Sequence, residues 1–207
     1  AAALRRRPRM DGPLGPVNRT TAVLLAFGAI LLGGVVGAVW WTLSPPALTP
    51  RVGLVPALAA GAATGGVLLV AAAWLERHLR SFAWVSRATE RALDQLGLPA
   101  PLAAGLAVAT SLGEELLFRG MLLDRFGLWA QALAFGALHP AGRRGWSYPV
   151  FVAVAGLALG GLVLVTGRIS SAMAAHVVVN GAGLLARRGR PPRPVRPPSD
   201  RSEPPPR

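Results

Sequence analysis

Residues 20–43 read TTAVLLAFGAILLGGVVGAVWWTL, an apolar run without a charged side chain. About 20 such residues are enough for a helix to cross the hydrocarbon core of a bilayer. The run is too long for the core of a secretory signal, and no small-residue cleavage site follows it. The pair Trp40–Trp41 near its end is typical of a membrane–water interface. The run therefore predicts a first transmembrane helix.

The composition of the whole chain also indicates a membrane protein. Hydrophobic residues make up 52% of the sequence and charged residues only 15%. There is no cysteine, which excludes disulfides, thiolate metal sites and cysteine nucleophiles. The net charge of +13 is concentrated near the ends and in loops, without the interleaved aromatic residues typical of nucleic-acid binding. We therefore expect membrane lipids, and no nucleic acid, among the partners.

Further apolar runs predict about six spans in all, and one segment of different character. The five later runs cover residues 52–75, 99–118, 126–139, 148–165 and 169–186. Residues 76–98 instead interleave arginines with apolar side chains at approximately helical spacing, which predicts an amphipathic helix on the membrane surface. The predicted fold is all-α: a polytopic transmembrane helical bundle with this surface helix between spans two and three.

The sequence divides into four predicted regions. A basic disordered leader covers residues 1–19, two spans and the surface helix cover 20–98, a helical core covers 99–186, and a disordered Arg/Pro-rich tail covers 187–207. With six spans, most arginines outside the core lie on one side of the membrane. The positive-inside rule then places both termini in the cytoplasm, and we expect a bacterial-type cell membrane.

A few charged or strongly polar side chains lie within or beside the apolar runs of the core. A charge near the bilayer centre costs about 2.5–3.5 kcal/mol on insertion scales, so such residues are usually functional. They form three clusters, each containing a pair at i, i+4 spacing. The candidates are Glu114, Glu115, Arg119, His139, His176 and Asn180.

The first cluster lies in SLGEELLFRG, residues 111–120. Glu115 and Arg119 share one helix face and are predicted to form an ion pair. Glu114 is rotated by about 100° from Glu115, so it remains available as a proton acceptor. A carboxylate in an apolar bundle suits a general base that works near neutral pH. We expect Glu115 to be structural and Glu114 to be catalytic; the alternative is that both are structural counter-ions.

The other two clusters are FGALH, residues 135–139, and HVVVN, residues 176–180. A lone histidine at a helix end, such as His139, is usually a satisfied interface residue. His176 and Asn180 share a face of the last span and have the donors needed to stabilise an oxyanion. Interhelical hydrogen bonding is the simpler alternative for that pair. All three clusters inside one small bundle favour an active site.

These motifs resemble the CPBP (Abi) family of intramembrane proteases, which includes CAAX prenyl endopeptidases and bacteriocin-processing and self-immunity proteins. The family pattern EExxxR, FxxxH and HxxxN occurs here in that order at residues 114–119, 135–139 and 176–180. The resemblance extends over about residues 99–186. The interval between the first two motifs is short for the family, which predicts a compressed fourth helix.

The resemblance implies an intramembrane endopeptidase of the glutamate type. In that family Glu114 and His139 would activate a water that attacks the scissile carbonyl, while His176 and Asn180 would stabilise the oxyanion. The substrate would be a membrane-associated peptide or protein. The supporting residues would be Glu115, Arg119 and Phe135.

Metal dependence and a non-enzymatic role are the open alternatives. The family is often described as metalloproteases, and a zinc ion would be held by Glu114, His139 and His176. The zincin pattern HExxH is absent, so we favour catalysis without a metal or other cofactor. The competing functions are a non-catalytic membrane scaffold, including an immunity or regulatory partner, and an ion carrier that uses the Glu/His cluster as a relay.

Overall fold

The structure is a computed structural model that describes residues 19–96 and 99–188; residues 1–18, where nearly all of the predicted leader lies, and the tail from residue 189 are outside the described residues. The described part forms seven α-helices and contains no β-strand, which confirms the all-α prediction. The helices are α1 (Arg19–Leu43), α2 (Leu54–His78), α3 (Arg80–Leu96), α4 (Ala100–Glu115), α5 (Leu123–Ala137), α6 (Ser147–Thr166) and α7 (Ile169–Arg188). A π-helical segment, η1 (Leu116–Leu122), joins α4 to α5, and a short 3-10 helix, η2 (Arg143–Gly145), precedes α6.

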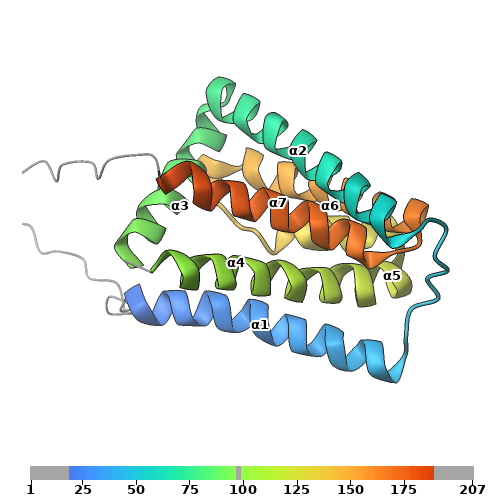
Figure 1. Ribbon diagram of the computed structural model, residues 1–207. Helices are drawn as coiled ribbons and strands as arrows, with labels where there is room; N and C mark the ends of the chain where they lie inside the picture. The colour runs from blue at the N-terminus through green and yellow to red at the C-terminus, as the bar shows by residue number, and fades with distance from the viewer. Residues whose placement is uncertain (1–18, 97–98, 189–207) are drawn as a thin grey trace, which may run out of the picture.

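The long helices lie roughly side by side in a bundle (Figure 1). The closest pairs are α2 with α7, α5 with α6, and α1 with α4, and α4 also packs on α7. The start of α1 and the end of α7 lie at the same end of the bundle, which we call the terminal end, together with α3 (Figure 1). This arrangement agrees with an even number of membrane crossings.

Several described helices are suited to a membrane by length and composition. Three helical segments are long and apolar enough to cross it: Leu54–His78, Pro101–Ala137 and Ser147–Thr166. Ile30–Leu43 and Ile169–Ala182 are shorter apolar helices. Large apolar side chains also cover the outer surface of the bundle, where Val70 is 71% exposed. Lipid chains provide the apolar surroundings that such a surface requires.

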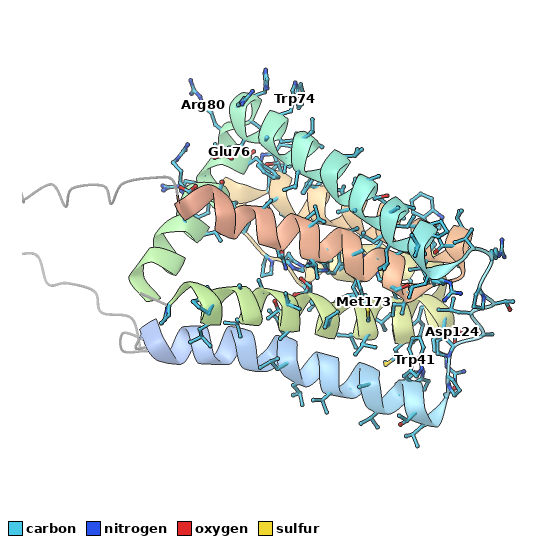
Figure 2. The ribbon with its side chains drawn as sticks, in the orientation of Figure 1. Trp41, Trp74, Glu76, Arg80, Asp124 and Met173 are labelled. Atoms are coloured by element: carbon cyan, nitrogen blue, oxygen red, sulfur yellow. The ribbon has the colours of Figure 1, made fainter. Side chains whose placement is uncertain are left out.

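Charged side chains lie at both ends of the bundle. Figure 2 shows Trp74, Glu76 and Arg80 at the terminal end and Asp124 at the opposite, far end. At the far end, the Arg125 guanidinium donates to Ser44 Oγ at 3.1 Å. Basic and aromatic side chains at the ends of spans are typical of anchoring at membrane interfaces.

The helix that carries the first motif continues further than predicted. We expected a span to end near Phe118 and the next helix to begin at Phe126, because charged residues lie between them. In the structure the chain stays helical through η1, since the Arg119 side chain is buried by its ion pair with Glu115 rather than placed at the surface. The break occurs at Gly127, whose φ of 78° lies in a region that glycine adopts readily.

Helix α3 lies between α2 and α4, as predicted, and its apolar side faces the protein. Phe82 and Val85 are buried, and α3 contacts η2 and α6. Ser81 Oγ and Ser147 Oγ are hydrogen bonded at 2.6 Å, which ties α3 to the start of α6. The helix therefore covers the terminal end of the bundle with Phe82 and Val85 packed on the protein, while Trp84 is 38% exposed.

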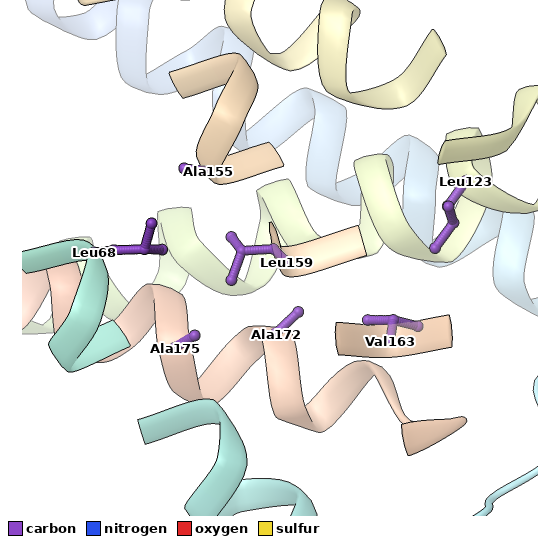
Figure 3. Close-up of a cluster of buried hydrophobic side chains, with 7 residues drawn as sticks. All are labelled: Leu68, Leu123, Ala155, Leu159, Val163, Ala172 and Ala175. Atoms are coloured by element: carbon purple, nitrogen blue, oxygen red, sulfur yellow. The ribbon is translucent and has the colours of Figure 1, made fainter. Parts of the chain in front are cut away.

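Small residues fill the centre of the bundle. One buried apolar cluster joins four helices and consists of Leu68, Leu123, Ala155, Leu159, Val163, Ala172 and Ala175 (Figure 3). On the adjoining face of α2, Gly61 and Gly65 form a small-xxx-small pattern against α7. A Cβ atom at Gly61 would lie only 2.1 Å from the Ser171 carbonyl oxygen. Close backbone contact of this kind is a principal means of helix association in membranes.

Replacing Gly61 with alanine is therefore expected to destabilise the α2–α7 pair. The added methyl group meets backbone atoms that cannot move aside, and overpacking of this kind costs about 1–3 kcal/mol of unfolding free energy. Thermal unfolding in detergent, followed by tryptophan fluorescence, measures the change. Gly66→Ala on the same helix is the control, since a Cβ there has no atom within 4 Å. Equal stability of the two variants would contradict the role of this contact.

Candidate active site

Polar residues from three parts of the bundle meet near its centre. Along α4 and η1, Ser111, Glu115 and Arg119 follow one another at intervals of four residues. His139 lies two residues after the end of α5, and α7 contributes His176 and Asn180. Antiparallel packing of α4 and α7 pairs these residues across the interface: Glu115 with His176, and Ser111 with Asn180.

Glu115 and Arg119 form the fully buried ion pair that their spacing predicted. Arg119 Nη1 donates to Glu115 Oε1 at 3.0 Å, and both side chains are 0% exposed. Arg119 Nη2 also reaches the Gly156 carbonyl oxygen at 3.4 Å. The guanidinium carbon lies 4.5 Å from the centre of the Phe135 ring, a cation–π contact. These contacts hold Arg119 against α4, α5 and α6.

His176 is oriented by Glu115. Its Nδ1–H donates to Glu115 Oε1 at 2.8 Å, because an ionised carboxylate can only accept. Its other ring nitrogen, Nε2, lies 3.6 Å from Glu114 Oε2. The two neighbouring glutamates thus contact opposite sides of one imidazole. A hydrogen bond to one ring nitrogen fixes both the tautomer and the orientation of the ring.

His139 is oriented by a backbone carbonyl. Its Nδ1–H donates to the Phe135 carbonyl oxygen at 2.7 Å, and its Nε2 lies 4.0 Å from Glu114 Oε2. The Phe135 ring packs edge-on against the imidazole at 4.8 Å between centres. The side chain of His139 is 26% exposed and that of Glu114 is 11% exposed. The site therefore lies at the boundary of the buried interior.

Three acceptor atoms face one another at this site. Glu114 Oε2 is buried and has no hydrogen-bond partner among the described residues. In the neutral imidazoles, both Nε2 atoms carry a lone pair, since each Nδ1 already holds the proton. The separations of 3.6 and 4.0 Å exceed those of direct hydrogen bonds but suit a shared small donor. A water molecule, with its two O–H groups, has the chemistry that this arrangement accepts.

The described residues do not form an evident metal centre. Among them, no group of three or more His, Cys, Asp or Glu side chains is suitably placed to hold a metal ion. The predicted zinc ligands are Glu114, His139 and His176, and the two imidazoles are 3.6 and 4.0 Å from the carboxylate. The atoms that bind one tetrahedral zinc ion lie about 3.3 Å from one another, so these separations are somewhat wider than in a formed zinc site.

The orientation of Asn180 depends on a residue that the sequence analysis did not select. Asn180 Nδ2 donates to Ser111 Oγ at 2.7 Å, and Ser111 Oγ donates to the Ala107 carbonyl oxygen at 2.8 Å. Ser111 is completely buried. A side-chain amide has two N–H groups, so Asn180 keeps a second donor. The position of Ser111, four residues before Glu115, was the signal in the sequence.

Two other polar residues near the site were not among the predicted site residues. Gln131 is fully buried on α5 and donates to the Gly156 carbonyl oxygen at 2.9 Å. Tyr148, near the start of α6, is partly buried, and its ring lies 6.4 Å from that of His139. Trp146, which is 61% exposed, instead has the exposure typical of an aromatic residue at a membrane interface.

A separate apolar groove lies between α5 and α6. Its volume is about 400 Å³, and its lining has no titratable side chain. The groove lies along the α5 face that includes Leu133 and Gly136, whereas Gln131 and Phe135 contact the buried network. It is therefore distinct from the candidate active site.

Residues 96–182 match the family model described as type II CAAX prenyl endopeptidase Rce1-like. This part of the chain is similar to that protease family. This Rce1-like region includes all three polar clusters, and the resemblance inferred from the motifs is confirmed. Together with the membrane-spanning helices, it makes the chain an integral membrane protein.

Sequence similarity to a curated protein is more limited. A Bacillus subtilis protein called "Uncharacterized protein YpbD" is 33% identical over 75 residues, which cover 36% of this chain and 40% of that protein. The chain thus spans less than half the length of this relative. No solved structure gives a significant match.

Proposed function

We propose that the chain is an intramembrane endopeptidase that hydrolyses a peptide bond in a membrane-associated peptide or protein. The observation that supports this most strongly is the convergence of two imidazole Nε2 atoms on Glu114 Oε2, at 3.6 and 4.0 Å. Such a set of acceptors binds and polarises a water molecule. The similarity to Rce1-like proteases gives the reaction class.

In the proposed reaction, a water bound between Glu114 and His139 is the nucleophile. Glu114 accepts one proton as the water oxygen attacks the scissile carbonyl carbon, and the carbonyl oxygen becomes an oxyanion. The proton then passes to the leaving amine as the C–N bond breaks, directly or through His139. The products are a carboxylic acid and an amine, so one water is consumed for each bond that is cleaved.

The proposed oxyanion donors are His176 and Asn180. We propose that His176 takes up a second proton before the attack, so that its Nε2, an acceptor in the neutral ring, donates to the oxyanion while Nδ1–H stays on Glu115 at 2.8 Å. Asn180 donates through the N–H that does not contact Ser111. Donors held in place before the reaction stabilise developing charge without reorganisation. Glu115, Arg119 and Phe135 hold these groups in position.

We propose that this reaction needs no metal, and chelation tests the proposal. Treatment with 1,10-phenanthroline or EDTA, followed by dialysis, is expected to leave the cleavage rate unchanged, because Glu114 and the imidazoles supply the proton transfers. A zinc enzyme would instead lose activity and regain it when zinc is added. Metal content measured on the active protein provides an independent check.

We further propose that both termini, and the terminal end of the bundle, face the cytoplasm. That end carries exposed arginines on α2, α3 and η2: Arg77, Arg80, Arg87, Arg143 and Arg144. Cytoplasmic loops are enriched in such residues. His139 directly precedes the loop that contains η2, so substrate would reach the site from near this face.

Terminal proteomics of membrane fractions tests the proposed function. Cells would express the wild type, Glu114→Gln or the control Glu76→Gln, whose side chain lies at the terminal end (Figure 2). We expect new protein termini in cells with the wild type or the control, and none with Glu114→Gln. Identical termini in all three would contradict proteolysis, and would leave the membrane scaffold as the better hypothesis.

A further inference from the structure

Gln131 is a fully buried polar residue in the middle of an apolar helix. Its Nε2 donates to the Gly156 carbonyl oxygen at 2.9 Å and to the Leu128 carbonyl oxygen at 3.1 Å. The first of these bonds joins α5 to α6. By itself it would be an ordinary interhelical hydrogen bond, which in membranes contributes only modestly to stability.

The same carbonyl oxygen connects Gln131 to the candidate site. Gly156 O also accepts from Arg119 Nη2 at 3.4 Å. Arg119 Nη1 binds Glu115 Oε1 at 3.0 Å, and that oxygen accepts from His176 Nδ1 at 2.8 Å. A continuous polar network therefore runs from Gln131 to the imidazole that faces Glu114.

Gln131 also shares a face with two residues of the second motif. Gln131, Phe135 and His139 follow one another at intervals of four residues along α5 and the residues after it. Phe135 stacks on the Arg119 guanidinium at 4.5 Å, and His139 Nε2 approaches Glu114 Oε2 at 4.0 Å. A rotation of α5 would displace both of these side chains. The amide of Gln131 opposes that rotation because it is fixed to α6.

The facing helix leaves room for this amide. A Cβ atom at Gly160 on α6 would lie 2.5 Å from Gln131 Nε2 and 2.7 Å from Leu128 Cδ1. At the next position, Gly161, a Cβ atom would meet nothing within 4 Å. Glycine at position 160 thus permits the close approach that the hydrogen bond requires.

We propose that Gln131 is a positioning residue of the hydrolytic site. It sets the rotation of α5 and holds the shared Gly156 carbonyl, so that His139 and His176 keep their Nε2 atoms near Glu114. It does not touch the reacting atoms. The expected effect on kcat rests on the proposed hydrolytic function. The placement of the two imidazoles can be measured without a substrate.

The main test compares Gln131→Met with Thr166→Val. Methionine has a similar shape but no donor, so the bond to Gly156 is lost. Thr166→Val is the matched control because it also removes a buried polar group. The Thr166 hydroxyl lies at the C-terminal end of α6, where it is hydrogen bonded to Leu162 and Ser171. We expect Gln131→Met to lower kcat by about 10- to 100-fold with KM nearly unchanged, since small misplacements are costly to catalysis. Thr166→Val should keep the wild-type kcat.

A second readout needs no substrate. The chain has three histidines, so imidazole ¹⁵N NMR can follow each of them. Gln131→Met is expected to shift the signals of His139 and His176 and to leave His78, at the end of α2, unchanged. Should that variant fail to fold, Gly160→Ala displaces the same amide, and Gly161→Ala is its control.

The outcomes separate this proposal from the proposed function. Unchanged imidazole signals of His139 and His176 in Gln131→Met would overturn the positioning role. It would also be overturned if Thr166→Val lost kcat as well, so that in both variants the loss of kcat followed the loss of thermal stability. Shifted signals support that role even if the wild type cleaves nothing. In that case the proposed hydrolytic function alone would be wrong.

Discussion

Replacing Glu114 with glutamine is expected to lower kcat by about 10²–10⁴-fold, the usual contribution of a general base. Glutamine is nearly isosteric but cannot accept the proton of the attacking water. KM should change little, because the side chain is assigned to the reaction and not to substrate binding. The measurement is the rate at which purified protein in liposomes cleaves a substrate identified by terminal proteomics.

Glu76→Gln is the matched control for this experiment, since it makes the same chemical change at the surface of the terminal end. It should keep the wild-type rate. A Glu114→Gln variant that folds normally and retains that rate would show that another group activates the water.

Replacing Arg119 with methionine is expected to cause the largest loss of stability. The substitution leaves the Glu115 carboxylate, which is 0% exposed, without its cationic partner. Breaking a buried ion pair in this way typically costs about 3–5 kcal/mol of unfolding free energy. Thermal unfolding in detergent measures the loss. Arg80→Met, at an exposed position, should have little effect.

The double variant Glu115→Leu/Arg119→Met separates stability from activity. Replacement of both partners of a buried pair by apolar residues is often neutral for stability. We therefore expect the double variant to regain most of the lost stability. It should remain inactive, because His176 Nδ1 has lost its acceptor. Stability of Arg119→Met equal to the wild type would contradict the importance of the pair.

Helical spacing and the cost of burying charge were sufficient to predict much of the site. The interval of four residues identified the Glu115–Arg119 pair, which the structure contains at 3.0 Å. Charged and imidazole side chains in apolar runs were few, so they could be selected individually. Spacing within a helix does not specify which helices touch. The approach of His139 and His176 to one carboxylate required the tertiary structure.

Uncharged polar residues were harder to predict. Ser111 and Gln131 are both completely buried and bonded to the network, yet serine and glutamine commonly form interhelical hydrogen bonds in bundles and therefore give little signal of a site. The position of Tyr148 near the start of a span is typical of interfacial aromatic residues and does not reveal its contacts with the site. In the structure, its ring lies near those of Phe82 and His139, at 5.8 and 6.4 Å.

Two features of the fold also depended on tertiary contacts. The helix continues past Phe118 because the charge of Arg119 is neutralised inside the bundle, which the sequence pattern does not reveal. The pattern of α3 predicted a helix on the membrane surface, but it did not reveal that Phe82 and Val85 are buried against the protein. An amphipathic pattern identifies the apolar side of a helix and not the surface that covers it.

The most direct test of a shared hydrolytic site is a double-variant cycle of Glu114→Gln and His139→Gln, with kcat measured for both single variants and the double variant. Residues that act on one water as a unit show strongly non-additive effects. We predict that the double variant is no slower than the slower single variant. Rate losses that multiply would show that the two side chains act independently, and would contradict a water held between them.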